Sequence, residues 1–468
     1  MPVNTPSKEY VATAPKWKRA RDTHDGSDAV KAAGTEYLPL LGSHTSSGDP
    51  EYAAYKARAV FFNGMARTVD ALSGGIFQKA PEIRAPEMVL EQLADATLKD
   101  EAVELFALFV AREVLITGRR GILIDLADDP RDEQARPIWL GYAAEDIFSY
   151  KTSRAGGDEI LTRVVLRERV VVGDTEDKDG FAVKEVEQYR VLELRNDVYV
   201  QNVWRVDKTG KWVRGPDIVP SRRESPLNFI PFTFLGPTTI SPRIAKPPLL
   251  DLVDVNISHY QTLADLEHGR HFVALPTPVV SGAQKPEGKL TIGSEAAWFL
   301  PEGGQAWMLE FTGQGLGALE RADEQKRHMM AVLGSRMMEE QPQTSQSETA
   351  FAINMRHAGE QATLRTLAQA LQTGLTLALQ WHTWWVGNAE TAGETDAMFV
   401  LNKDFSSARM TPEELRAHVE AFTAGAVSFD TLYFNLTRGD LGRPGVTADQ
   451  ELADVRASQP ASAGSPTN

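Results

Sequence analysis

The histidines, the residues most often used in catalysis and metal binding, are spread along the chain without the spacing that either role needs. There are nine, and none begins an HExxH motif. His268 and His271 stand three residues apart and could share a metal ion, but two ligands without a nearby third make a poor site. Both lie where a helix is predicted to end, and the helix dipole favours a histidine there. We therefore predict no metal site and no cofactor.

Motifs for nucleophiles and phosphate binding are also missing from the sequence. The chain has no cysteine and no GxSxG segment, so it lacks a thiolate nucleophile and the nucleophile elbow of a hydrolase. Residues 313–317 (GQGLG) resemble a glycine-rich phosphate loop, but the GK[ST] ending is missing and no βαβ unit is predicted around them. A flexible junction explains this segment better. We expect the protein not to be an enzyme, and we assign it no catalytic residue.

Three tryptophans, Trp381, Trp384 and Trp385, lie close together in the sequence. They could form a platform on which nucleic acid bases stack, or they could pack in a core or at a subunit interface. Base stacking usually comes with a basic groove, whereas the neighbouring residues here are neutral. The sequence therefore favours packing over a role in base stacking.

The overall composition is that of a globular protein with more than one core. The chain has 468 residues, 42% of them hydrophobic and 24% charged. With 49 Lys and Arg against 64 Asp and Glu, the net charge is −15, which argues against a protein that binds nucleic acid over its whole surface. The N-terminus has no apolar leader, and no run of about 18 apolar residues could span a bilayer. We expect neither secretion nor contact with a membrane.

Residues 1–246 are predicted to form an arm and then an α+β unit. Residues 1–49 mix basic residues with Gly, Ser and Pro and show no apolar periodicity, which favours a partly flexible arm. Two helices are predicted within 50–118. The first is capped by Asp49 and ends at Gly74-Gly75, and the second spans about 100–117. Over 121–235 the apolar period changes to two and turn residues punctuate short runs. This pattern predicts strands at 121–126, 163–172, 185–194, 197–206 and 229–235.

The rest of the chain is predicted to be mostly helical, with one insert that contains short strands. Helical periodicity predicts three helices, at 247–270, 313–338 and 348–387. The segment 271–312 is rich in Pro and Gly and holds short apolar runs, whereas 339–347 is polar and without a pattern. A strand at 397–401, a helix from Thr411 and a shorter helix after Ser428 are predicted within 388–457, followed by a disordered tail at 458–468.

This order of elements is similar to that of the portal proteins of tailed bacteriophages, the head-to-tail connectors. Three local strings strengthen the resemblance: residues 55–63 (YKARAVFFN), residues 76–81 (IFQKAP), and Glu348-Thr349-Ala350 at the start of the long helix. The resemblance covers nearly the whole chain, from about Tyr37 to Leu452. It implies a wing (50–246), two stem helices (247–270 and 313–338), a clip (271–312), a tunnel loop (339–347), a long helix (348–387) and a crown-like region (388–457).

The resemblance also implies a function and a set of partners. Portal subunits form a ring, usually a dodecamer, at one capsid vertex, and double-stranded DNA passes through the ring during genome packaging and ejection. The partners it implies are the terminase large subunit, head–tail adaptor or tail proteins, and the major capsid and scaffold proteins. We would then expect the protein in the virion, assembled in the host cytoplasm, with no membrane partner.

Candidate residues can be chosen for each part of such a ring. A helix that lines a channel needs one polar face, and the opposite face of 313–338 would pack through Ala322, Met329, Met330 and Leu333. The candidates for the channel-facing side are Glu320, Arg321, Glu324, Lys326 and Arg327. A loop that touches moving DNA should be polar but not strongly cationic, because each neutralised phosphate adds affinity. Residues of this kind are Gln341, Gln343, Thr344, Ser345 and Gln346, and the candidates for partner docking on the clip are Lys285 and Lys289.

A second hypothesis is an uncharacterised soluble enzyme or binding module with a helical C-terminal half. The two hypotheses differ in the expected particle mass. A stable monomer of 51.5 kDa that never forms rings would favour the second hypothesis.

Overall fold

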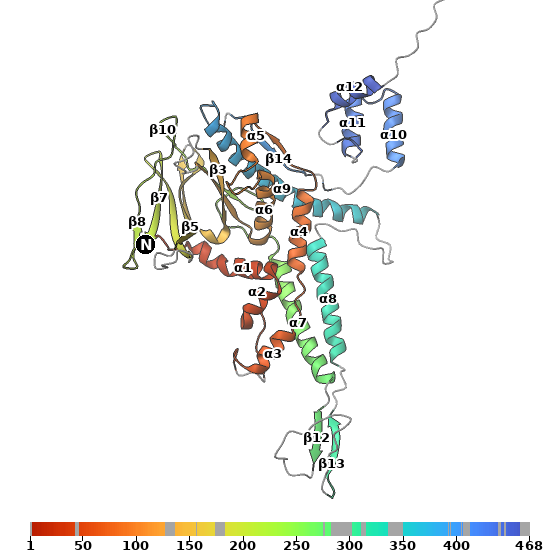
Figure 1. Cartoon of the computed structure of the whole chain (residues 1–468). Helices are drawn as coiled ribbons and strands as arrows, with labels where there is room; N and C mark the ends of the chain where they lie inside the picture. The colour runs from red at the N-terminus through yellow and green to blue at the C-terminus, as the bar shows by residue number, and fades with distance from the viewer. Residues whose placement is uncertain are drawn as a thin grey trace, which may run out of the picture. The chain divides into compact units, whose positions relative to one another are not determined.

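The computed structural model of the chain contains two compact units, Met1–Lys403 and Asp404–Asn468. Helices and antiparallel sheets are mixed along the chain, so the fold class is α+β, as predicted (Figure 1). The structure describes residues 2–42, 46–126, 136–155, 157–173, 183–274, 277–281, 302–309, 315–335, 350–391, 393, 395–403, 405, 412–438, 441–443 and 446–458.

The N-terminal residues form packed helices, α1 (Lys8–Asp25) and α2 (Ser27–Ala32). Trp17 and Ala20 on α1 are fully buried. The prediction of a partly flexible arm over residues 1–49 is therefore wrong for these helices. A buried tryptophan removes a large apolar surface from water, and this outweighs the basic and small residues that suggested an arm.

The helix predicted from Asp49 onward is in fact two helices, α3 (Pro50–Arg58) and α4 (Gly64–Ile76). Asp49 caps α3, as predicted. Asn63 caps α4, because its side-chain oxygen accepts a hydrogen bond of 2.9 Å from the Ala66 amide. Apolar residues continue at helical spacing across the break, which is why periodicity alone predicts one helix.

Two further helices precede the sheets, α5 (Glu87–Leu93) and α6 (Val103–Thr117). Gly118 ends α6 in the left-handed region, with φ of 75°. A Cβ atom at this position would lie only 3.0 Å from the Lys246 carbonyl oxygen, so glycine is needed for the close approach as well as for the backbone angle. The chain then enters the first strand of a sheet.

Two antiparallel sheets follow. The three-stranded sheet has the order β11-β2-β3, and the five-stranded sheet has the order β4-β5-β6-β7-β8. Their strands are β2 (Arg120–Leu126), β3 (Pro137–Ala143), β4 (Ile147–Ala155), β5 (Asp158–Gly173), β6 (Val183–Arg195), β7 (Val198–Val206), β8 (Trp212–Arg214) and β11 (Phe232–Leu235). Asn196 and Asp197 form the β6–β7 turn with positive φ, which Asn and Asp tolerate better than most residues. The strands β3 and β4 are not among those predicted.

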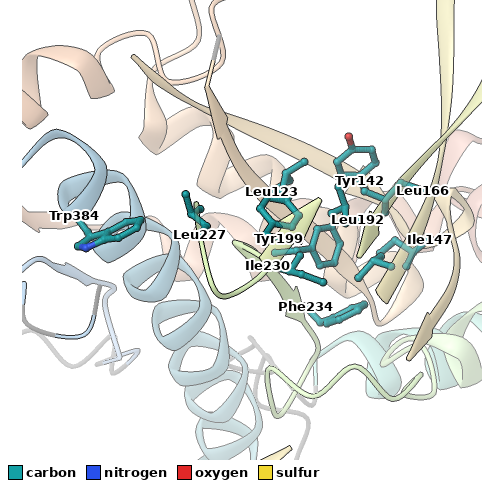
Figure 2. Close-up of a cluster of buried hydrophobic side chains, with 12 residues drawn as sticks. Leu123, Tyr142, Ile147, Leu166, Leu192, Tyr199, Leu227, Ile230, Phe234 and Trp384 are labelled. Atoms are coloured by element: carbon teal, nitrogen blue, oxygen red, sulfur yellow. The ribbon is translucent and has the colours of Figure 1, made fainter. Parts of the chain in front are cut away.

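An apolar core cluster lies between these sheets (Figure 2). Leu123 and Tyr142 contribute from the smaller sheet, and Ile147, Leu166 and Leu192 from the larger one. Trp384 reaches the same cluster from the long helix α9 (Ala350–Val386). The predicted packing role of this tryptophan is thus confirmed, and the sheets and α9 share one core.

The second half of the first unit contains α7 (Leu250–Ala274), a hairpin of β12 (Thr277–Ser281) and β13 (Gln305–Leu309), then α8 (Leu316–Ser335) and α9. These correspond in position to the helices predicted at 247–270, 313–338 and 348–387. Strand β14 (Met398–Val400) follows α9 and pairs with β1 (Glu82–Arg84). None of the described helices is both long and apolar enough to cross a membrane.

The second unit contains α10 (Pro412–Thr423), α11 (Phe429–Arg438) and α12 (Ala448–Ser458). Phe429 links the first two, because its ring contacts Phe422 edge-on and stacks on Tyr433. Helix α12 was not predicted. Its signal is the Thr447-Gln450 capping box, in which each side chain bonds the other residue's amide.

Candidate functional site

The candidate site is the pair of helices α7 and α8, which lie side by side (Figure 1). Apolar side chains of α7 are buried along much of its length, and α7 also packs on α1, α3 and α4. These residues include Leu252, Val253, Ile257, Tyr260 and Leu263. Helix α7 is therefore the inner helix of the pair, and α8 lies against it with one side exposed.

The exposed side of α8 carries charges of both signs. It includes all but one of the predicted channel-facing residues, namely Glu320, Arg321, Glu324 and Arg327. Two carboxylates and two guanidinium groups give this set no net formal charge. Such a face attracts a polyanion weakly, because it would neutralise few phosphates.

Lys326 differs from the other four candidates because it faces α7. Its ammonium group donates to the Ser258 carbonyl oxygen at 3.0 Å and to the Thr262 hydroxyl at 2.6 Å. Burial lowers the pKa of this ammonium. Lys326 is thus a contact between the two helices, and the prediction that it lies on the exposed polar face does not fit its position.

The buried side of α8 contains fewer of the predicted apolar residues than expected. Met330 is buried and Ala322 and Leu333 are half-buried, but Met329 is 50% exposed. Neighbouring residues on a helix point about 100° apart, so Met329 and Met330 cannot both face α7. Packing of α8 onto the chain consequently depends on few large apolar side chains.

A buried polar contact joins the middle of the two helices. His259 of α7 is fully buried, and its Nε2 atom lies 2.6 Å from Asp323 Oδ1 of α8. Asp323 also pairs with Arg327, at 2.8 Å. Burial lowers the pKa of the His259 imidazole, and the cations of Arg327 and Lys326 act in the same direction, whereas Asp323 opposes them. The neutral imidazole, donating Nε2–H to the carboxylate, is the favoured form.

A second ion pair joins the helices closer to the β12–β13 hairpin. Arg270 of α7 pairs with Glu320 of α8 at 3.0 Å and with Glu267 at 2.8 Å. These side chains are about half exposed, so the pair contributes little to stability. Gly269 allows the close approach here, since a Cβ atom would lie 2.7 Å from a Leu316 methyl carbon.

Helix α4 holds both members of the pair. The Asn256 side chain of α7 accepts hydrogen bonds from the Gly64 and Met65 amides, at 3.0 and 3.1 Å, and so satisfies two amides at the start of α4. Gly64 also lies against Met330 of α8. Further along, a Cβ atom on Gly334 would lie 2.8 Å from the Thr68 hydroxyl. Three helices therefore meet where α8 ends.

Comparisons with known proteins give one family match and several structural likenesses. The family is described as a domain of unknown function (DUF4055), and it matches residues 248–386, which run from the start of α7 to the end of α9. No curated protein matches the chain. One similar solved structure is titled as the virion of a native gene transfer agent particle, with 12% identity and a TM-score of 0.41 over 87% of this chain and 98% of that chain. Another is titled as the neck of an empty particle of this kind computed with C6 symmetry, with 12% identity and a TM-score of 0.39 over 89% and 100%.

Two predicted sets of site residues lie outside the described residues. The first is the clip set, Lys285 and Lys289. The second is the loop set, Gln341, Gln343, Thr344, Ser345 and Gln346. The strands β12 and β13, which flank the first set in the sequence, are described, and Val279 pairs with Trp307, which is 48% exposed. Both sets of residues remain predictions.

The alternative sites considered from the sequence have structural explanations. The His268 ring lies edge-on to Tyr55, with 5.2 Å between the ring centroids. Trp381 is buried, and Arg222 covers the ring of Trp384 at 4.5 Å. Within the described residues, no three His, Asp or Glu side chains come together as a metal site requires.

A groove of about 400 Å³ lies along the end of β7 and β8. Its titratable side chains are Arg205, Asp207 and Arg214. Asp207 is committed to its own turn, since it accepts hydrogen bonds from the Thr209 and Lys211 amides. The groove therefore lacks the paired acid and base that the enzyme hypothesis needs.

Sequence reasoning missed the residues that hold the two helices together, above all His259, Asp323 and Asn256. His259 falls within the apolar pattern of α7, and a histidine at such a position signals a buried polar contact. Its partner lies 64 residues away in the sequence, and no local pattern identifies it.

Proposed function

We propose that this chain is the portal subunit of a tailed phage or a phage-like particle. Twelve copies would form a ring at one capsid vertex, through which DNA is packaged and ejected. In this proposal α7 and α8 are the stem, the segment that contains β12 and β13 is the clip, and α9 follows the tunnel loop. The terminase large subunit and the adaptor or tail proteins would dock on the ring, and the major capsid and scaffold proteins would surround it.

The observation that supports this proposal best is the arrangement of α7, the β12–β13 hairpin, α8 and α9. Two neighbouring helices are joined through an antiparallel hairpin, and one of them has an exposed face of mixed charge. A closed ring repeats such a face around an axis, because each copy uses the same contacts. The repeated faces would line a channel.

The charges fit passage of DNA better than tight binding. Twelve copies carry 12 × −15 = −180 formal charges, and the exposed residues of α8 add no net positive charge to the channel. Affinity for DNA grows with each phosphate that a cation neutralises. A wall without excess cations therefore allows DNA to move.

The proposal is tested by isolating the protein from assembled particles and imaging it by electron microscopy. Rings with a central channel are expected, with a mass that is a multiple of 51.5 kDa. A stable monomer in particle-derived material, without rings, would contradict the proposal and favour the binding-module hypothesis.

Deletion of residues 341–346 tests the tunnel loop. We expect rings to assemble as before, because residues 341–346 (QPQTSQ) have no large apolar side chain to bury, while DNA packaging or retention is lost. The measurements are ring yield by microscopy and packaged DNA per particle. Loss of rings would assign the segment to assembly instead.

Charge reversal of Lys285 and Lys289 tests the clip. The double variant Lys285→Glu, Lys289→Glu should form rings that bind the terminase or adaptor protein more weakly and with a smaller salt dependence. Lys208→Glu, at the β7–β8 turn, is the matched control, and it should leave docking unchanged. Equal docking by the double variant and the control would contradict this position of the clip.

A further inference from the structure

The contact between α7 and α8 combines a buried histidine with an incomplete set of hydrogen bonds. His259 Nε2 is paired with Asp323, but its buried Nδ1 has no hydrogen-bond partner among the described residues. In the neutral ring Nδ1 is only an acceptor, and leaving one acceptor unmet is tolerable. In the protonated ring it becomes an N–H donor, whose burial without an acceptor is unfavourable.

The charges around His259 also disfavour a proton on the ring. Helix α8 presents one carboxylate, Asp323, and two cations, Arg327 and Lys326. Asp323 is already shared with Arg327. On another side lies the Phe62 ring, at 6.0 Å between ring centroids, and it is covered in turn by Arg67. A protonated His259 would thus be a third cation beside a single carboxylate.

The other contacts of α8 are made mostly by half-buried or exposed side chains. Met330 is its buried large apolar residue, Leu316, Leu319, Val332 and Leu333 are half-buried, and the Arg270–Glu320 pair is exposed. Lys326 remains, but its two acceptors on α7 are neutral. Loss of the central contact would therefore free much of the helix.

We propose that His259 and Asp323 form a proton-sensitive latch, which docks α8 on α7 when the imidazole is neutral and releases it when the imidazole is protonated. This inference goes beyond the proposed function, because it concerns docking within one chain and does not depend on whether the chain forms a ring. The direction is specific: acid should loosen the pair. A simple imidazolium–carboxylate ion pair would instead tighten in acid.

Spin labels can measure the latch directly, because the chain has no cysteine of its own. Labels on Ala71→Cys of α4 and Gln325→Cys of α8, both at exposed positions, report how α8 sits on the rest of the chain. At about pH 8 we expect one narrow distance, and at about pH 5 a loss of that distance in favour of a broad distribution. An unchanged or narrower distribution in acid would overturn the proposal.

Two variants separate the latch from general acid effects. His259→Gln keeps an N–H donor for Asp323 but cannot titrate, so the narrow distance should persist at about pH 5. His328→Gln removes an exposed histidine of α8, and this variant should loosen in acid as the parent does. Acid loosening that persists in His259→Gln would contradict the latch.

A measurement on the unmodified residue covers the case in which His259→Gln does not fold. Imidazole NMR of the parent chain should show His259 titrating below the ordinary value of 6.5. A pKa above 6.5 would overturn the proposal, since the docked state would then prefer the protonated ring.

Discussion

His382 and His259 are both fully buried, one beside the sheets and one between α7 and α8, but their hydrogen bonds differ. His382 Nδ1 accepts from Trp139 Nε1 at 3.2 Å, and Nε2 donates to the Gln92 side-chain oxygen at 2.9 Å. Both nitrogens are used, so α9, β3 and α5 are fixed around one ring. His259 uses one nitrogen and joins two helices.

The surroundings of the two histidines also differ, because those of His382 are mainly apolar and those of His259 are mainly polar. The sheet core is a cluster of aliphatic and aromatic side chains to which α9 contributes Trp384. The α7–α8 contact includes the polar residues His259, Asp323 and Lys326, and Met330 is the large apolar side chain of α8 that is buried. Apolar burial holds one arrangement over a wide range of conditions, whereas a polar contact depends on protonation. We call the sheets and the surroundings of His382 the fixed region, and the α7–α8 contact around His259 the adjustable region.

The largest expected effect follows from breaking the fixed region at Trp139. Trp139→Ala removes a buried indole and the donor to His382, and it should lower the free energy of unfolding by about 3–5 kcal/mol. Urea unfolding followed by circular dichroism measures this. Trp307→Ala, at a 48% exposed position, is the control and should change stability far less. Similar losses in both variants would contradict the contrast between core and surface.

A somewhat smaller effect is expected from acid acting on His382. Burial lowers its pKa from 6.5 to about 4, with Arg136 acting in the same direction. The folded protein therefore holds this ring neutral. The stabilisation is complete above about pH 6.5 and is lost as the pH falls towards 4, for a total of about 3 kcal/mol.

The difference in unfolding free energy between the parent and His382→Gln isolates this contribution, because both chains share all other titrating groups. We expect the parent's advantage to shrink from pH 8 to pH 4. If the advantage stays constant over this range, His382 does not titrate as its surroundings indicate.

The smallest effect is expected from Asp323→Asn in the adjustable region. The substitution leaves His259 and Arg327 without their carboxylate, and it should cost about 1–3 kcal/mol. Glu324→Gln, the exposed neighbour, is the matched control and should stay within about 0.5 kcal/mol of the parent. A cost above that of Trp139→Ala would reverse the comparison between the regions.

Some of this fold was predictable because its signals are local. Asp49 and Pro50 mark the start of α3, Gly118 marks the end of α6, and Asn196-Asp197 marks the β6–β7 turn. In each case the residue suits the local backbone. Asp49 accepts a hydrogen bond from an amide at the helix start, and Gly118, Asn196 and Asp197 adopt positive φ. The helices α7, α8 and α9 were likewise indicated by apolar periodicity.

Other features depend on contacts that no local pattern contains. Helix α1 is fixed by the burial of Trp17, although its composition suggests an arm. Asn256 binds the amides of Gly64 and Met65, which lie 192 and 191 positions away in the sequence. The position of Lys326 is decided by which acceptors α7 offers. Because of these tertiary contacts, Lys326 faces α7, although the sequence predicts it on the exposed polar face of α8.

Helix α1 has a mechanical consequence that follows from two of its arginines. Arg19 pairs with Asp254 of α7 at 3.0 Å, while Arg21 pairs with Glu113 of α6 at 3.0 Å and with Glu145, beside the five-stranded sheet, at 2.8 Å. Residues two apart on a helix point roughly 200° apart, so these contacts lie on opposite sides of α1. Helix α1 therefore connects α7 with α6 and with the sheet region through ion pairs on its two opposite sides. A tilt of α7 would have to change these contacts of α1.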